Sequence, residues 1–199
     1  MTARTSRLIL LIAVFCTATV LCLSVVLLVA QRPALPVQQS SAAVGGPFKL
    51  VDQDGRTVTE QDVKGKPSLV FFGFTHCPDV CPTTLFDISE IFRALGPDAD
   101  RASALFFTVD PERDTPEAMK AYLSSFDPHL RGLTGDQAAV DGAIRAYRAY
   151  AKKVPNPDGS YTMDHTALVY LMDKNGGFVS PFSLKRRPEE SAADLRKYF

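Results

Sequence analysis

Two cysteines spaced four residues apart are the clearest candidates for chemistry in this sequence. Cys77 and Cys81 lie in the segment THCPDVCP, where an apolar stretch is followed by a predicted helix. Within a helical turn this spacing places both sulfur atoms on one face, and a helix N-terminus stabilises thiolates. Two thiolates on one face can close a disulfide or bind a soft metal ion.

The spacing of this pair also bears on which chemistry is expected. Thioredoxins carry C-x-x-C, whereas this chain has C-x-x-x-C with Pro78 and Pro82 in the motif. The extra residue and the prolines indicate a pair held open rather than one adapted to rapid disulfide exchange. Because two thiolates rarely complete a metal shell, a third ligand is expected from elsewhere in the chain.

Three histidines are available as that third ligand. His165 is our candidate, because it stands directly before a predicted strand at residues 166–172. Two thiolates and one imidazole suit Cu(I) and can also accept Cu(II), whereas zinc usually takes a fourth ligand. His76 is expected to tune the thiolate of Cys77 or to face solvent, and His129 is expected at the surface.

The elements that must position these residues follow from hydrophobic periodicity and turn signals. A hairpin is predicted first, and the later elements alternate between strands and helices, which indicates a layered α/β domain. The predicted elements are the hairpin at 48–59, strands at 68–74, 104–109, 166–172 and 178–181, and helices at 82–95, from 115, from 134 and at 187–199.

This order matches the thioredoxin-like plan of two βα units followed by a β-hairpin and a helix. In thioredoxin-like folds the loop before the strand that corresponds to residues 166–172 faces the cysteine motif. Thioredoxin-type enzymes place a cis-proline in that loop. Here the position is His165-Thr166. An imidazole in place of that proline favours a metal site over a disulfide exchanger.

Several neighbours of these residues are candidates for supporting roles. Asp164 is either a hydrogen-bond partner of an imidazole or a surface residue, and Met163 is expected to pack rather than to bind metal. Asp110 and Asp114 are expected to shape a loop near the site, with Thr115 as a helix cap. The basic run 185–187 is expected to be solvated, or to attract an acidic redox partner.

Four separated motifs resemble the Sco/SenC proteins. They are GFTHCPDVCP, DPERDTPE, LTGD and MDHTALVYLMDKNG, which occur in the family's order within residues 47–199. The resemblance implies a thioredoxin-like fold that binds one copper ion through Cys77, Cys81 and His165. It also implies a role in assembling the binuclear copper centre of cytochrome c oxidase, by delivering copper, by reducing the target's cysteines, or by both.

Three alternative functions remain open at this stage. The first is a thiol–disulfide oxidoreductase in which Cys77 attacks and Cys81 resolves, the two forming a disulfide when oxidised. The second is a peroxiredoxin, disfavoured because the usual upstream Pro-x-x-x-Thr pattern is missing. The third is a copper sensor that binds the metal without donating it. The expected partners are the copper-centre subunit of the oxidase and other periplasmic copper chaperones.

The distribution of apolar and charged residues predicts four segments. Residues 8–30 carry no charge and are long enough to span a bilayer, and residues 31–47 read as a flexible linker. Residues 1–7 form a short n-region, and 48–199 form the thioredoxin-like domain. The 22 basic and 22 acidic residues form no clustered basic face, which excludes a nucleic-acid-binding class.

The N-terminal charges predict the orientation of the anchor. Arg4 and Arg7 precede the apolar segment, so the positive-inside rule places the N-terminus in the cytoplasm. The segment exceeds the usual length of a cleaved signal's apolar region and lacks an A-x-A cleavage pattern. We therefore expect a single-pass protein of a bacterial inner membrane, with its domain in the periplasm. Cys16 and Cys22 lie within the anchor and are expected to act as small apolar residues.

Overall fold

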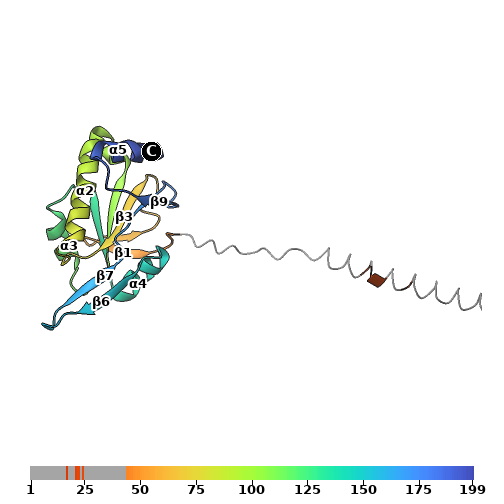
Figure 1. The fold of residues 1–199 in the computed structure, drawn as a ribbon, viewed down its shortest axis with the longest axis horizontal. Coiled ribbons are helices and arrows are strands. Elements are labelled where there is room, and N and C mark those ends of the chain that lie inside the picture. The colour runs from red at the N-terminus through yellow and green to blue at the C-terminus, as the bar shows by residue number, and fades with distance from the viewer. Residues whose placement is uncertain (1–16, 18–20, 23, 25–43) are drawn as a thin grey trace, which may run out of the picture. The chain divides into compact units, whose positions relative to one another are not determined.

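The computed structural model describes residues 17, 21–22, 24 and 44–199. Among these residues no helix is both long and apolar enough to cross a membrane. Apart from residues 17, 21, 22 and 24, the predicted anchor at 8–30 lies outside the described part of the chain, as does the linker up to residue 43. The fold described below is that of residues 44–199 (Figure 1).

A seven-stranded sheet forms the centre of the domain, in the order β2-β1-β5-β4-β3-β8-β9. Strands β3, β4 and β5 run parallel to one another. At either side of this group, β1 pairs antiparallel with β5 and β8 pairs antiparallel with β3. A separate two-stranded sheet pairs β6 with β7. The strands are β1 (Lys49–Asp52), β2 (Thr57–Thr59), β3 (Ser68–Gly73), β4 (Ser103–Thr108), β5 (Leu130–Thr134), β6 (Ala151–Pro155), β7 (Tyr161–His165), β8 (Val169–Met172) and β9 (Phe178–Phe182).

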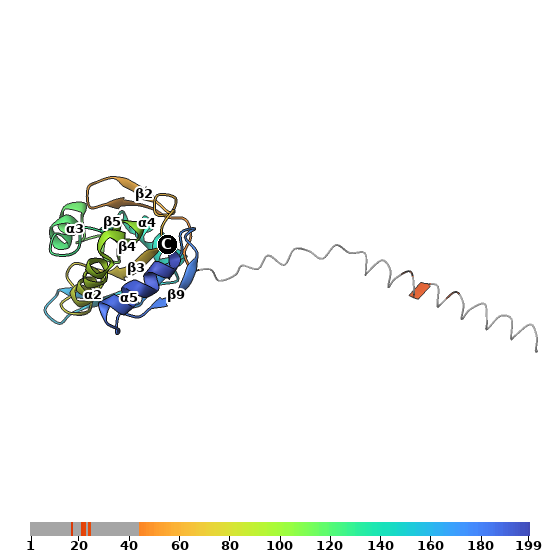
Figure 2. The ribbon, with the colours of Figure 1, turned by 90° about the horizontal axis from the view of Figure 1, so that it is seen from above.

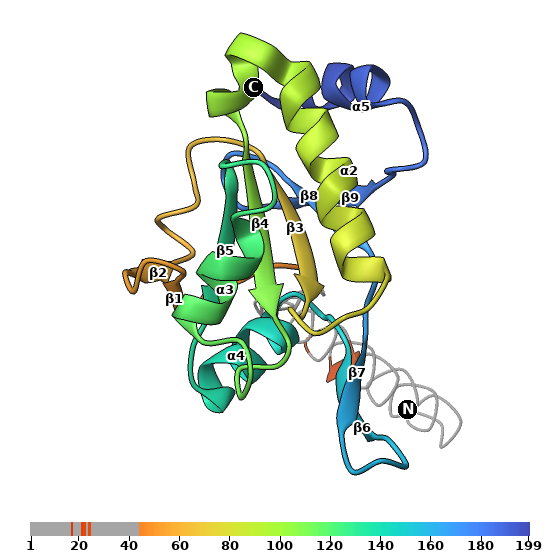
Figure 3. The same ribbon diagram turned by 90° about the vertical axis from the view of Figure 1, so that its left-hand side faces the viewer.

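Helices cover the sheet. They are α2 (Val80–Leu95), α3 (Pro116–Leu123), α4 (Gln137–Ala146) and α5 (Pro188–Leu195), with 3-10 turns at Gly96–Arg101 and Arg196–Tyr198. Helices α2 and α5 lie side by side in the view from above (Figure 2), and they contact each other directly. Figure 3 shows α2 and α3 in front of the parallel strands and the β6–β7 hairpin beyond the end of β3 where α2 begins.

Aromatic side chains on alternating strand positions fill both faces of the sheet. Phe71 of β3 stacks on Phe106 of β4 on one face, and Phe72 stacks on Phe107 on the other. All four are nearly fully buried, as expected for parallel strands covered on both sides. Tyr147, at the end of α4, packs on Phe72 and Phe107, which places the end of that helix on the second face.

The structure confirms the layered α/β class, the N-terminal hairpin and the predicted helices. Thr115 caps α3 and Asp136 caps α4, each by accepting a hydrogen bond from a helix N–H. Helix α2 begins two residues earlier than predicted, at Val80, which places Cys81 inside the helix and leaves Cys77 in the loop before it.

Three strands were not predicted. Strand β5 (Leu130–Thr134) is short and contains a glycine, and the hairpin strands β6 and β7 carry lysines and polar residues instead of an apolar run. The predicted strand at 166–172 begins only at Val169. His165 is therefore the last residue of β7, and three residues separate it from β8.

Candidate metal centre

One cluster of metal-binding side chains stands out in the described part of the chain. It consists of Cys77, Cys81 and His165, whose potential ligand atoms all lie within 4.8 Å of one another. Bonds of about 2.0–2.3 Å to nitrogen and sulfur would place two donors of one ion roughly 3.5–4.6 Å apart. The predicted residues are therefore brought together at distances that one small ion can bridge.

The two cysteines lie on either side of the start of α2. The N–H of Cys81, one of the free amides at the helix start, donates to Sγ of Cys77 at 3.3 Å. Cys77 is half-buried and Cys81 is buried, and both are free thiols in this structure. The loop and the first helical turn together bring the sulfurs together, rather than the single helical turn that the spacing suggested.

His165 presents one ring nitrogen to the cysteines. Its Nε2 lies 3.6 Å from Sγ of Cys81, and its Nδ1 lies 3.1 Å from the carbonyl oxygen of Thr166. Because a carbonyl oxygen only accepts, this contact favours the tautomer with the proton on Nδ1, in which the lone pair of Nε2 faces the sulfurs. The imidazole packs edge-on against Phe71 and Phe74, with ring centroids 6.1 and 5.8 Å away.

The sulfur of Cys81 sits in a space that a glycine leaves open. A Cβ atom at Gly73 would lie 2.7 Å from Sγ of Cys81 and 2.7 Å from a ring carbon of Phe106. Burial raises the pKa of the Cys81 thiol, and the neighbouring Cys77 raises it further. The pKa of the Cys81 thiol is thus raised, the opposite direction from that expected at a helix N-terminus, and burial is the largest cause.

A buried carboxylate holds the loop that leads to Cys77. Asp114 is fully buried and accepts hydrogen bonds from Thr75 N and Thr75 Oγ1, the latter at 2.6 Å. It also accepts from Thr108 Oγ1 at 2.6 Å. Burial raises the pKa of Asp114 despite these hydrogen bonds. The prediction that Asp110 and Asp114 shape a loop near the site is confirmed for both residues, which lie in the loop between β4 and α3.

The other two histidines are placed apart from the donor set. His76 is exposed, and its Nδ1 contacts Thr75 Oγ1 at 3.0 Å, as its predicted solvent-facing role requires. His129 is half-buried instead of lying at the surface. It stacks on Phe92, and its two ring nitrogens contact Asp127 and Asp100.

The structure also places the neighbouring residues and the basic run for which supporting roles were considered. Met163 is half-buried and packs against the core, as predicted. Asp164 is exposed, and the imidazole bonds through Nδ1 to the carbonyl of Thr166, which takes the supporting place considered for Asp164. Within the basic run, Arg186 pairs with Asp194 and Arg187 with Glu190, so both charges are matched within the C-terminal segment.

Sequence reasoning missed the groups that hold the donors. None of these groups is a metal ligand. Gly73 acts through its missing Cβ, Thr166 through its backbone carbonyl, and Thr75 through its N–H and hydroxyl toward Asp114, so their roles appear only in the folded chain. Tyr161 was likewise not singled out, although it lies on the same strand as His165. Its position four residues before the histidine was the only sequence signal, and it becomes meaningful only once β7 is known.

Comparison with known proteins identifies the family of this chain and relatives whose structures contain copper. The SCO1/SenC family model matches residues 36–199. A SCO2-like protein of Rickettsia felis is 36% identical over 156 residues, which cover 77% of this chain and 76% of the relative. The structure of Bradyrhizobium japonicum ScoI with copper bound is 67% identical and has a TM-score of 0.77, covering 79% of this chain and 100% of that one. The structure of yeast Sco1 with copper bound is 36% identical and has a TM-score of 0.71, covering 78% and 88%.

The fold and the site together define a thioredoxin-like protein with two cysteines and one histidine clustered at the end of a central strand. The chain belongs to the SCO1/SenC family.

Proposed function

We propose that this protein is a copper chaperone for the binuclear copper centre of cytochrome c oxidase, with Cys77, Cys81 and His165 binding one copper ion. The observation that carries the proposal is the clustering of these three donors within 4.8 Å, with Nε2 of His165 3.6 Å from Sγ of Cys81. Two soft thiolates and an imidazole form a donor set suited to Cu(I). The copper-bound structures of relatives support the choice of metal.

The mechanism of copper transfer follows from the small number of protein ligands around the ion. Three protein donors leave room for an incoming thiolate of the target, so copper can pass from one protein to the other by stepwise exchange of ligands. Cys77 is the more exposed of the two sulfur donors. It is therefore the sulfur donor at which exchange with a target cysteine can begin, while buried Cys81 and half-buried His165 hold the ion.

The proposal places the domain outside the cytoplasm of a bacterium. The uncharged segment 8–30 serves as a single anchor of the inner membrane, with Arg4 and Arg7 on the cytoplasmic side. Residues 31–43 then form the linker. Residues 44–47, expected as its last part, already belong to the domain, since Val44 packs against the core and the N–H of Gly45 donates to the carbonyl of Ala146 at 3.0 Å. This arrangement lets the domain reach an oxidase subunit in the same membrane, and other periplasmic copper chaperones are its candidate donors.

A copper-transfer experiment tests this proposal. The purified chain, loaded with one equivalent of Cu(I), is mixed with the metal-free copper-binding domain of the oxidase subunit, and copper is measured in each protein after separation. Copper in the target domain would support chaperone function. Retention of all copper by this chain, with a reduced and folded target, would contradict it.

A second candidate function is reduction of the target's cysteines. It is favoured by the unequal exposure of the pair, since an attacking thiol must be accessible and a resolving thiol need not be. Cys77 as thiolate would attack the target disulfide and displace one target thiolate. Cys81 would then attack the mixed disulfide, releasing the second target thiolate and forming a Cys77–Cys81 disulfide, so that the target gains the two electrons that this chain loses.

The variant His165→Ala separates the two functions. It removes a copper donor and leaves both thiols, so copper transfer should fail while thiol–disulfide exchange persists. Loss of both activities in a folded variant would show that exchange also depends on the imidazole, and it would contradict the simple thiol mechanism.

A further inference from the structure

The loop at residues 110–115 lies between the cysteine side and the histidine side of the candidate site. It follows β4, next to the end of β3, where the N–H of Val109 donates to the carbonyl of Gly73 at 2.8 Å. Asp110 and Asp114 within the loop are buried, with exposed fractions of 2% and 0%. The backbone of the loop is thus fixed on the central sheet.

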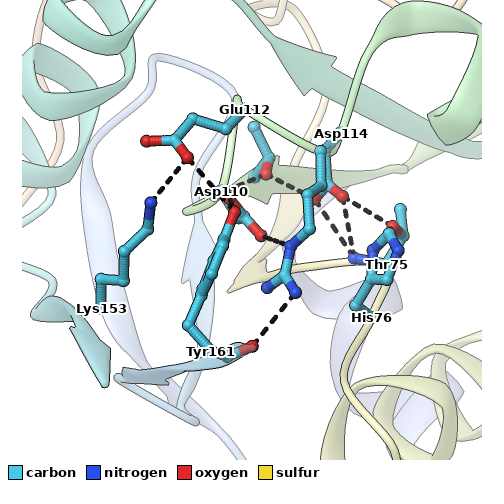
Figure 4. Close-up of polar contacts among 9 residues, drawn as sticks. Thr75, His76, Asp110, Glu112, Asp114, Lys153 and Tyr161 are labelled. Atoms are coloured by element: carbon cyan, nitrogen blue, oxygen red, sulfur yellow. Dashed lines mark hydrogen bonds and ion pairs between the residues drawn. The ribbon is translucent and has the colours of Figure 1, made fainter. Parts of the chain in front are cut away.

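Asp114 binds the cysteine side. Its carboxylate accepts hydrogen bonds from the N–H and the hydroxyl of Thr75, two residues before Cys77. Figure 4 shows the side chain of Asp114 directed toward Thr75, with His76 beside it. This contact fixes the backbone from which the cysteine motif begins.

Arg113, the preceding residue, binds the histidine side. Its Nη1 donates to the carbonyl oxygen of Tyr161 at 3.1 Å, and its guanidinium lies 3.8 Å from the centre of the Tyr161 ring. Its Nε donates to Asp110, which also accepts from the hydroxyl of Tyr161 at 3.0 Å. The guanidinium further lies over Phe74, whose ring packs against His165.

Glu112 and Lys153 add an outer contact to the same hairpin. Their ion pair is 2.6 Å long, and the ammonium of Lys153 lies 4.0 Å from the centre of the Tyr161 ring. Both charged groups are largely exposed, so this pair contributes little by itself. The stronger connection to the hairpin lies deeper, where Nη1 of Arg113 donates to the carbonyl of Tyr161 and the hydroxyl of Tyr161 donates to buried Asp110.

The hairpin needs such a connection because β6 and β7 are paired with each other and not with the main sheet. An isolated two-stranded hairpin is only marginally stable and has no ladder to fix its orientation. His165 ends this hairpin, whereas the cysteines follow a strand of the main sheet. The chain joins the hairpin to β8 of the main sheet at Val169, with three residues between it and His165, and side-chain contacts are needed to fix the orientation of the hairpin about that junction.

We propose that Arg113 and Asp114 are positioning residues that set the distance between the sulfur donors and the imidazole. One backbone segment carries both groups, so the cysteine loop and the histidine hairpin are held to a common support. The inference rests on the proposed function, because the donors that it positions are the proposed copper ligands. Arginine is suited to this place because its rigid planar fork directs Nε to the carboxylate of Asp110 and Nη1 to the carbonyl of Tyr161 while its flat face lies over the Tyr161 ring, a combination that the flexible point charge of a lysine does not reproduce.

The test compares Arg113→Met and Arg113→Lys with the parent, using the full chain in detergent under reducing conditions. Cu(I) affinity is measured by competition with a chromophoric chelator, and amide hydrogen exchange of residues 151–165 is measured in the metal-free protein. Arg131→Met is the matched control, because Arg131 also bonds a buried carboxylate, that of Asp52, but lies in β5.

We expect Arg113→Met to bind Cu(I) about 10- to 100-fold more weakly, the range found for groups that orient metal ligands, and to exchange faster in the hairpin. Arg113→Lys should recover only part of the loss, and it replaces the Met variant if that variant does not fold. Arg131→Met should lose stability and keep the parent's affinity and hairpin exchange.

Three results would overturn the positioning role. They are parent affinity in a folded Arg113→Met variant, an equal loss of affinity in Arg131→Met, or unchanged hairpin exchange in Arg113→Met. Failure of the parent itself to bind copper would instead refute the proposed function. The exchange measurement needs no metal, so it still decides whether Arg113 holds the hairpin.

Discussion

At the scale of single residues, the site depends on three donor side chains and on the glycine and the backbone carbonyl that contact them. The cysteines and the histidine could be predicted from the sequence, because side-chain chemistry and spacing identify them. Gly73 and the carbonyl of Thr166 could not, since their contributions come from a missing Cβ and a backbone oxygen. The pKa of Cys81 also depends on burial that only the folded chain reveals.

The variant Gly73→Ala tests the space beside Cys81. The new methyl group would lie 2.7 Å from the sulfur, so the sulfur or the strand must move. We expect a loss of about 1–3 kcal/mol in the free energy of unfolding, as for overpacked cores, together with weaker Cu(I) binding. Denaturant unfolding and chelator competition measure the two effects.

Gly142→Ala is the matched control for this change. Gly142 lies within α4, and the nearest atom to an added Cβ is 4.0 Å away. Alanine should therefore stabilise the protein by up to about 1 kcal/mol and leave copper affinity unchanged. Equal copper affinity in Gly73→Ala and the parent would refute the close fit at Cys81.

The raised pKa of Cys81 predicts how copper binding depends on pH. The thiol is protonated in the metal-free protein at neutral pH, and binding must displace that proton. The apparent affinity for Cu(I) should therefore rise with pH, by about tenfold per unit for each proton released. Titration calorimetry between pH 6 and 8, in two buffers of different ionisation enthalpy, counts the protons. An affinity independent of pH would contradict the protonated state assigned to Cys81.

At the scale of secondary-structure elements, the sequence predicts the strands that are continuous apolar runs and the helices that begin with a capping residue. Strands β3 and β4 are continuous apolar runs, and Thr115 and Asp136 mark the starts of α3 and α4. The β6–β7 hairpin was missed because its strands are short, partly exposed and polar. This hairpin delivers His165, so an important element of the site is also the one with the weakest sequence signal.

The variant Asp136→Ala tests the capping of α4 apart from the metal site. The carboxylate accepts from Ala139 N at 2.8 Å, and its loss should cost about 0.5–2 kcal/mol of unfolding free energy. Copper stoichiometry should stay at the parent's value. Glu189→Ala, at an exposed position in the first turn of α5, should change stability by less than about 0.5 kcal/mol. Equal stability of Asp136→Ala and the parent would show that the cap contributes nothing.

At the scale of the whole molecule, the proposed anchor and linker precede a domain whose candidate metal site lies at the end of the central sheet. Residues 44–199 form a compact unit with its own core, which is enough to place the three donors. The charge asymmetry around segment 8–30 is what places this unit outside the cytoplasm in the proposal.

The membrane arrangement makes its own prediction. In bacterial cells the full chain should stay with the membranes after alkaline carbonate extraction, and protease added to spheroplasts should digest the domain. The double variant Val14→Arg and Val20→Arg should be released, since an arginine at the centre of a span costs about 2.5–3.5 kcal/mol. A parent domain protected in spheroplasts and digested only after lysis would contradict the periplasmic placement.

The most direct test of the central claim is the copper content of the reduced chain beside His165→Ala and the double variant Cys77→Ser/Cys81→Ser. Each protein is incubated with excess Cu(I), freed of unbound metal under a competing chelator, and analysed for copper and protein. We predict one copper per parent chain and none retained by either variant. No retained copper in the reduced parent, or one copper per chain in the double variant, would contradict the assignment of this site.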